Sequence, residues 1–150
     1  MNEELRELYQ EVILDHNSSP RNFRRLDSAT HTCEGYNPLC GDRINIFVKI
    51  SDNKIEDIAF QGSGCAISKA SASVMTTEVK GKTIAQAREL FQRFQRLIKG
   101  ETAEDDGLEH SKLAIFAGVR EFPSRVKCAA LAWHTLLSAI EQKKDIVTTE

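Results

Sequence analysis

The alternation of apolar and polar residues predicts a β-hairpin in the first half of the chain. Every second residue of the segment 43–50 is aliphatic and β-branched, which is typical of a strand with one buried face. These residues are Ile44, Ile46, Val48 and Ile50. A polar turn at 51–53 separates this segment from 54–61, a second expected strand that pairs with it. A further strand is expected near 28–36.

Apolar residues spaced three and four positions apart predict helices in the rest of the chain. The first helix precedes a break at 17–20, and the second begins at or near Cys65. Thr83 and Gln86 have the spacing of a capping box, which predicts the start of a third helix. The remaining expectations are an acidic exposed loop at 100–107, a shorter helix at 108–120 and a last helix that starts near Pro123.

The order of these elements predicts an α+β fold. Strands occupy the first half of the chain and most helices follow, which favours a small antiparallel β-sheet of about three strands packed against four to six helices. The chain has 150 residues, with no internal repeat and no linker. We therefore expect a single domain over 1–150.

Composition narrows the function classes. The net charge is −2 and no long basic run occurs, which argues against a nucleic-acid partner. No apolar run reaches membrane-spanning length, and the acidic, amphipathic N-terminus is unlike a signal peptide. In a chain that is not expected to be secreted, four cysteines indicate metal or thiol chemistry rather than disulfides. A cytoplasmic location is therefore expected.

Three cysteines, Cys40, Cys65 and Cys128, each lie near a glycine or a proline, and Asp42 follows two residues after Cys40. Three thiols and one carboxylate are ligand types that a zinc or iron centre accepts, so this set predicts one metal site. Cys65 and Cys128 lie near expected helix starts, where the helix dipole and free N–H groups favour the thiolate. The alternative for each thiol is a buried structural role.

Other candidate residues carry weaker signals. Cys33 stands in the expected strand near 28–36 and is interpreted as structural. The four histidines show no paired spacing typical of metal ligands. Arg125 is interpreted either as a surface charge or as a group that holds a persulfide or a partner carboxylate. Lys127 either lowers the pKa of the neighbouring Cys128 thiol or is simply solvated.

Three motifs, in this order along the chain, resemble those of the U-type iron–sulfur cluster assembly proteins, the family that includes the N-terminal domain of NifU. The motifs lie at 37–43, 62–68 and 122–129. The resemblance implies a small antiparallel sheet with helices on it. Lys127 stands where the scaffold branch of the family has a histidine, and 80–100 resembles an extra segment of the SufU branch.

The resemblance to the SufU branch also implies a ligand set and a partner. The implied cofactor is Zn²⁺, and the implied ligands are Cys40, Asp42, Cys65 and Cys128. The implied partner is a pyridoxal-phosphate cysteine desulfurase of the SufS type, with downstream iron–sulfur assembly proteins as further partners. Among these ligands Cys40 is expected to accept sulfur, because it lies on a loop beside the flexible Gly41. Cys128 is the second candidate.

Three functions fit these features. The first is a zinc-dependent sulfur acceptor, a sulfurtransferase-type carrier rather than a stand-alone enzyme. The alternative is a scaffold on which a transient [2Fe–2S] cluster is built and then passed to apo-proteins. The third is a closed structural zinc site on an interaction module. The first function is preferred because the departures from the scaffold branch point to it.

Overall fold

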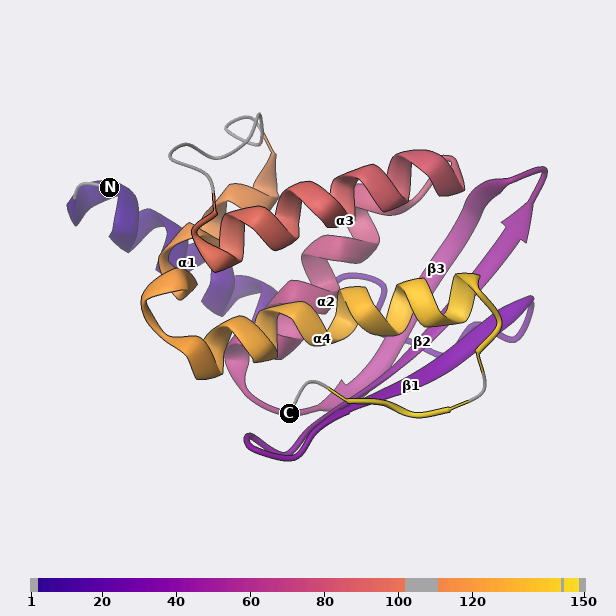
Figure 1. Cartoon of the computed structure of the whole chain (residues 1–150), viewed down its shortest axis with the longest axis horizontal. Helices are drawn as coiled ribbons and strands as arrows, with labels where there is room; N and C mark the ends of the chain where they lie inside the picture. Colours follow the sequence, from indigo (N-terminus) through magenta and orange to yellow (C-terminus); the bar gives the residue numbers. More distant parts are fainter. Residues whose placement is uncertain (1–2, 102–110, 144, 149–150) are drawn as a thin grey trace.

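Helices cover one face of a small β-sheet in the computed structural model, which describes residues 3–101, 111–143 and 145–148 (Figure 1). The predicted α+β class is confirmed. The elements are α1 (Glu3–Ser18), β1 (His31–Asn37), β2 (Asp42–Ser51), β3 (Lys54–Ser63), α2 (Ala66–Val79), α3 (Ile84–Lys99), the 3-10 helix η1 (Lys112–Glu121), α4 (Pro123–Ile140) and β4 (Val147–Thr148).

The sheet has the strand order β3–β2–β1–β4. β2 pairs antiparallel with both β1 and β3, so the predicted hairpin and the additional strand before it are confirmed. β4 adds a short parallel edge beside β1, opposite Gly35 and Tyr36. The sequence did not indicate this fourth strand, because two residues are too few to show a period-two pattern.

Apolar side chains of the sheet and the helices meet in one core. Ile44, Ile46 and Val48 are almost completely buried, as their alternation predicts, whereas Ile50 at the end of β2 is only half-buried. Trp133 of α4 stacks on Phe94 of α3, with ring centroids 5.1 Å apart. Within the described residues, no helix combines the length and the apolar character needed to cross a membrane.

Local signals fix where several helices begin. Thr83 accepts the backbone N–H of Gln86, and the Gln86 side chain accepts the backbone N–H of Thr83, so the predicted capping box of α3 is confirmed. Pro123 occupies the first turn of α4, where its missing N–H has no helical partner to lose. The helix expected at 108–120 is a 3-10 helix from Lys112 onward, and its first positions lie outside the described residues. Of the loop expected at 100–107, only residues 100 and 101 are described.

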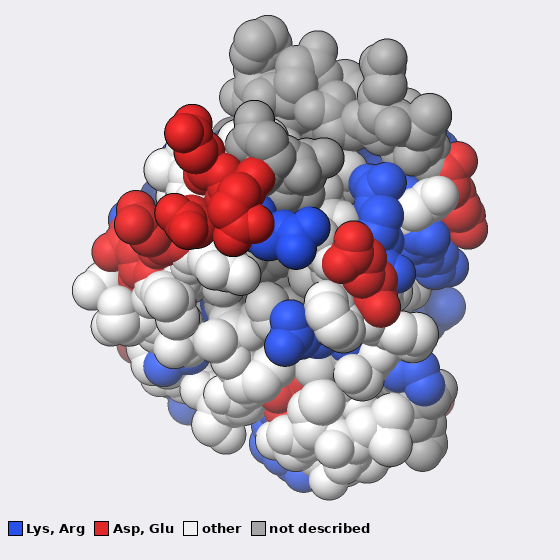
Figure 2. Space-filling view, turned by 90° about the vertical axis from the view of Figure 1, so that its left-hand side faces the viewer, with Lys and Arg blue, Asp and Glu red and all other residues white. Residues whose placement is uncertain are grey.

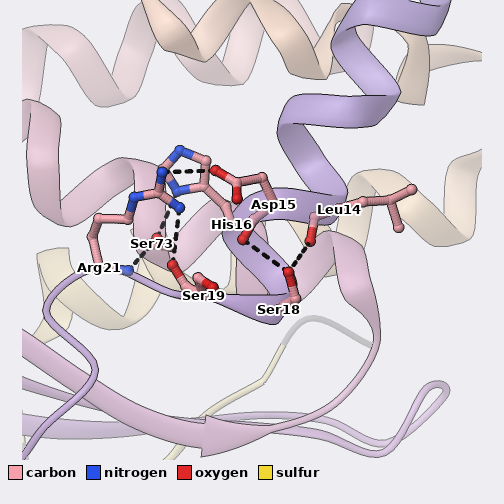
Figure 3. A network of polar contacts seen from close by, with 7 residues as sticks. All are labelled: Leu14, Asp15, His16, Ser18, Ser19, Arg21 and Ser73. Carbon is pink, nitrogen blue, oxygen red and sulfur yellow. Dashed lines mark hydrogen bonds and ion pairs between the residues drawn. The ribbon is translucent and has the colours of Figure 1, made fainter.

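Buried polar contacts hold the end of α1 and the following loop against α2 (Figure 3). Nδ1 of the buried His16 lies 2.7 Å from Oγ of Ser73, which also accepts the backbone N–H of Arg21 at 2.8 Å. Burial lowers the pKa of His16, which favours the neutral ring, and one hydrogen bond joins its Nδ1 to the Ser73 hydroxyl. Arg21 forms an ion pair with Asp15 at 2.7 Å. These contacts anchor the segment that leads into β1.

Ser73→Ala is predicted to destabilise the protein, because it leaves both the buried His16 ring and the Arg21 N–H without a partner. The expected loss in the free energy of unfolding is about 1–3 kcal/mol. Urea unfolding followed by circular dichroism measures it. Ser51→Ala, at the exposed end of β2, is the matched control and should leave the midpoint unchanged. Equal midpoints for both variants would contradict the anchoring role.

Candidate metal centre

The four predicted ligand residues come from separate segments that end or begin at the same end of the sheet (Figure 1). Cys40 lies in the turn between β1 and β2, and Asp42 is the first residue of β2. Cys65 is the N-cap residue of α2, and Cys128 lies near the start of α4. The β1–β2 hairpin therefore supplies two candidate ligands, and each of two helix starts supplies one.

Ligand atoms of three of these four residues lie close enough to share one ion. One oxygen of Asp42 and the Sγ atoms of Cys40 and Cys128 are all within 4.8 Å of one another. The Cys40 and Cys128 sulfurs are 3.2 Å apart. Cys65 falls outside this group of three, but its Sγ is 3.8 Å from Asp42 Oδ2. Since a zinc–thiolate bond of about 2.3 Å gives ligand–ligand edges of about 3.8 Å in a tetrahedron, the group of three could hold a zinc ion, with the Cys65 sulfur beside its Asp42 oxygen.

Asp42 is fully buried, and its two carboxylate oxygens have different surroundings. Oδ1 accepts the backbone N–H of Cys65 at 2.7 Å. This approach depends on Gly64, because a Cβ at that position would lie 2.3 Å from Asp42 Oδ1. Oδ2 faces the Cys65 sulfur. The loop before α2 therefore fixes one oxygen and leaves the other directed at the thiols.

A hydrogen bond between the Cys65 and Cys128 side chains shifts the pKa of both thiols. The hydrogen bond from Cys128 lowers the pKa of Cys65 to about 7, and the backbone N–H groups of Ser68 and Ile67 act in the same direction. The same hydrogen bond, together with burial, raises the pKa of Cys128. Cys65 is therefore the thiol of this pair that loses its proton first, which agrees with its position at the start of a helix.

Cys40 differs from the other two thiols in its exposure. It is exposed in a turn, whereas Cys128 is only 2% exposed and Cys65 is half-buried. Gly41 follows with φ +69°, a left-handed conformation that favours glycine. The side chain of the preceding Leu39 is 65% exposed. Cys40 is thus the thiol that an approaching molecule meets first.

The other candidate residues are in different surroundings. Arg125 stacks over the ring of Phe122, with its guanidinium carbon 4.4 Å from the ring centroid, and lines a groove between α1 and η1. Lys127 lines a different groove, together with Lys99 and residues of β4. Cys33 lies on β1 beside the carbonyl of Asp145 and is not among the grouped ligand atoms.

Comparison with known proteins identifies the family. The model of the NifU-like N-terminal domain matches residues 8–129. The chain belongs to this family. The matched range contains all four candidate ligands, and the resemblance inferred from the three sequence motifs is confirmed.

Relatives in this family carry two kinds of name. The zinc-dependent sulfurtransferase SufU of Bacillus subtilis is 38% identical over 143 residues, covering 95% of this chain and 96% of SufU. The iron–sulfur cluster assembly scaffold protein IscU of Streptococcus pyogenes is 41% identical over 138 residues, covering 92% and 86%. A crystal structure from Fervidobacterium islandicum, named as a proposed assembly scaffold of the SUF system, superposes with a TM-score of 0.81 at 33% identity and covers 89% and 97%.

Sequence reasoning missed Asn37 as a residue of this site. Its fully buried side chain contacts both Asp42 and Cys128. The sequence also does not mark Gly64 as the position that lets the backbone reach Asp42. An asparagine before a proline is typical of an ordinary turn, so no pattern in the sequence distinguishes this one.

Gly64→Ala is predicted to disrupt the site, because the added Cβ would lie 2.9 Å from the Asp42 Cα as well as against its carboxylate. Overpacking of this kind costs about 1–3 kcal/mol of folding free energy. Thermal and urea unfolding measure the loss. Gly118→Ala is the control, since its Cβ would meet nothing within 4 Å. A Gly64→Ala variant as stable as the Gly118→Ala variant would show that the close approach is unimportant.

Proposed function

We propose that this protein is a zinc-dependent sulfur acceptor in iron–sulfur cluster assembly. The observation that carries the proposal is the unequal exposure of the candidate ligands: Asp42 and Cys128 are buried, and Cys40 is exposed on a turn. A site of this kind can keep its ion while one thiol becomes available to another molecule. The Bacillus subtilis relative named as a zinc-dependent sulfurtransferase supports the same function.

Cys40, Asp42, Cys65 and Cys128 would hold the zinc ion. When bound, zinc supplies positive charge that keeps the thiols deprotonated at neutral pH. The protein holds two of the thiols in fixed positions: Cys65 is the N-cap residue of α2, and Cys128 is packed into α4. Cys40 alone lies in a turn, next to the left-handed Gly41.

The sulfur step begins when Cys40 becomes free as a thiolate. Its Sγ attacks the outer sulfur of a persulfide on the partner, R–S–SH. The S–S bond of that persulfide breaks, the partner leaves as R–S⁻, and Cys40 becomes the new persulfide, so atoms and electrons balance without an added oxidant. Cys128 is a poorer acceptor, because only 2% of its surface is exposed and an incoming persulfide cannot approach its sulfur. The chain therefore acts as a carrier rather than as a stand-alone enzyme.

The proposed partner is a pyridoxal-phosphate cysteine desulfurase of the SufS type. Figure 2 shows the end of the molecule that carries the Cys40 turn: uncharged side chains cover much of its lower part, and acidic ones gather higher up, over the start of α1. Leu39 and Phe122 are 65% and 46% exposed, so apolar contact area is available near the site. Arg125, stacked on Phe122, is proposed to contact the partner.

A cytoplasmic location is proposed for this protein. All four cysteines are free thiols, which suits a cytoplasmic location. The persulfide on Cys40 would be consumed by downstream iron–sulfur assembly proteins. The whole chain, residues 1–150, is proposed to act as one domain.

A second candidate function is that of a scaffold for a transient [2Fe–2S] cluster, which would be the cargo of the protein. The Streptococcus pyogenes relative named as a scaffold supports this alternative. The same three thiols and one carboxylate would ligate the cluster, and an oxygen ligand among thiolates makes release easier. Transfer of an assembled cluster to an apo-protein, without a persulfide on Cys40, would favour the scaffold.

We predict about one zinc ion per purified chain, as one four-ligand site implies. Cys65→Ser and Cys128→Ser should lower the zinc content and the melting temperature, because zinc binding contributes to folding free energy. Elemental analysis and calorimetry measure both effects. Cys33→Ser is the matched control and should keep its zinc. Loss of zinc in the Cys33→Ser variant would mean that the ligand set is wrong.

The sulfur acceptor is predicted to be Cys40. The zinc-loaded protein is mixed with a SufS-type desulfurase and cysteine, then quenched by alkylation, and peptide mass spectrometry locates the added sulfur. The expected result is one extra sulfur atom on Cys40, with Cys65 and Cys128 unmodified. Cys40→Ser should abolish the signal, whereas Cys33→Ser should keep it. A persulfide on Cys128 with Cys40 unmodified would reject this assignment and favour the scaffold function.

A further inference from the structure

Asn37 occupies a buried position at the base of the turn that carries Cys40. It is the last residue of β1 and pairs in register with Asp42, the first residue of β2. Its side chain is fully buried. A buried amide destabilises the folded protein unless its polar atoms are hydrogen-bonded. The hydrogen-bond partners of Asn37 are therefore the groups that it holds in place.

The side-chain amide of Asn37 reaches three parts of the site. Nδ2 lies 3.3 Å from Asp42 Oδ2 and 3.5 Å from Cys128 Sγ, and its two N–H groups allow one donation to each. Oδ1 accepts the backbone N–H of Leu39 at 3.3 Å, which closes a small turn before Cys40. One side chain thus contacts a carboxylate ligand, a thiol ligand and the turn that carries a third ligand.

Both oxygens of the Asp42 carboxylate consequently have a protein donor. Oδ1 receives the Cys65 backbone N–H, and Oδ2 receives the Asn37 amide. With both oxygens held, the carboxylate cannot rotate freely, and Oδ2 still has a lone pair for an ion. Hydrogen-bonded partners of this kind orient metal ligands and raise metal affinity.

The contact with Leu39 limits which part of the turn can move. Pro38 has a fixed φ angle, and the Leu39 N–H is held by Asn37. Cys40 and Gly41 follow these anchored residues, and Gly41 has the backbone freedom of glycine. Displacement of the Cys40 thiol can therefore be confined to these two residues, without disturbing Asp42 at the start of β2.

We propose that Asn37 is a positioning residue that holds Asp42 and Cys128 on the ion while Cys40 leaves it. The proposal rests on the proposed function, since it assumes that zinc binds these residues. Its amide donates to two groups that are negative in the metal-bound site, and hydrogen bonds to charged acceptors are the stronger ones. Without the amide donors, Asp42 and Cys128 lose the contacts that keep them in place during transfer.

The substitution Asn37→Asp separates this role from that of a turn former. The introduced carboxylate can accept the Leu39 N–H as asparagine does, because both residue types form this turn. It has no N–H to donate, and it would lie about 3.3 Å from the carboxylate of Asp42, since the amide nitrogen is at that distance. If Asn37 is needed only for the turn, the Asn37→Asp variant should therefore behave like wild type. If Asn37 is needed as a donor to the metal ligands, it should not.

The test compares the rate at which zinc leaves full-length, zinc-loaded wild type and variants when each is mixed with a chromophoric chelator. Stopped-flow absorbance measures this rate. The variants are Asn37→Asp, which keeps an acceptor for Leu39, and Asn37→Ser, which is uncharged and lacks the amide. Asn45→Ser is the matched control for Asn37→Ser, because Asn45 is half-buried on β2 and is paired across the sheet with Glu34 rather than with a candidate ligand. The absorption spectrum of the Co²⁺-loaded proteins reports the ligand geometry independently of zinc affinity.

The expected result is zinc release about tenfold to a hundredfold faster in both Asn37 variants, with altered Co²⁺ spectra, and wild-type behaviour in Asn45→Ser. Should the aspartate variant not fold, faster release from Asn37→Ser alone supports the proposal. Release from Asn37→Ser at the wild-type rate or slower overturns it. Sulfur transfer is measured separately, on the wild-type protein. If the wild type binds zinc but accepts no sulfur, the carrier function is refuted. The comparison of zinc-release rates still decides the role of Asn37.

Discussion

The carboxylate of Asp42 is fully buried at the start of β2, and a buried charge is stable only with hydrogen bonds and a partner of opposite charge. The protein supplies the hydrogen bonds from the Cys65 backbone and the Asn37 amide. It supplies space through Gly64, where a Cβ would clash. Within the described part of the chain, the groups that contact this carboxylate are a backbone N–H, an amide and a thiol, none of which is a cation. The Asp42 carboxylate forms, with the Cys40 and Cys128 thiols, a group that could hold a metal ion as its counter-charge.

The same arrangement divides the candidate ligands into fixed and movable ones. Cys65 caps α2, Cys128 is packed within α4, and Asp42 belongs to the sheet, so moving any of these three would disturb a regular element. Cys40 belongs to a turn whose base is anchored by Asn37. Release of Cys40 from a bound ion would therefore cost fewer packed contacts than release of the other candidate ligands, which is the property that the proposed sulfur carrier would require.

Much of the fold could be predicted from the sequence, because its signals are local and repeated. The β2–β3 hairpin follows from alternating isoleucines, and the start of α3 follows from Thr83 and Gln86. β4 and the 3-10 form of η1 were not predicted, since a two-residue strand has no period and tertiary packing decides the tighter helix. The candidate ligands were identified by residue type, but Asn37 was missed because its role depends on contacts with Cys128, which lies far away in the sequence.

The two candidate functions draw on one set of side chains, and this limits how they can coexist. Zinc and a [2Fe–2S] cluster would both need Cys40, Asp42, Cys65 and Cys128, so one chain can hold only one of them at a time. Lys127 adds no ligand, because its ammonium group has no lone pair and its side chain lines a groove beside β4. Cys40 cannot accept sulfur while it ligates a cluster. The metal that occupies the site therefore selects the function, and the anchoring of Asp42 and Cys128 by Asn37 would act on either.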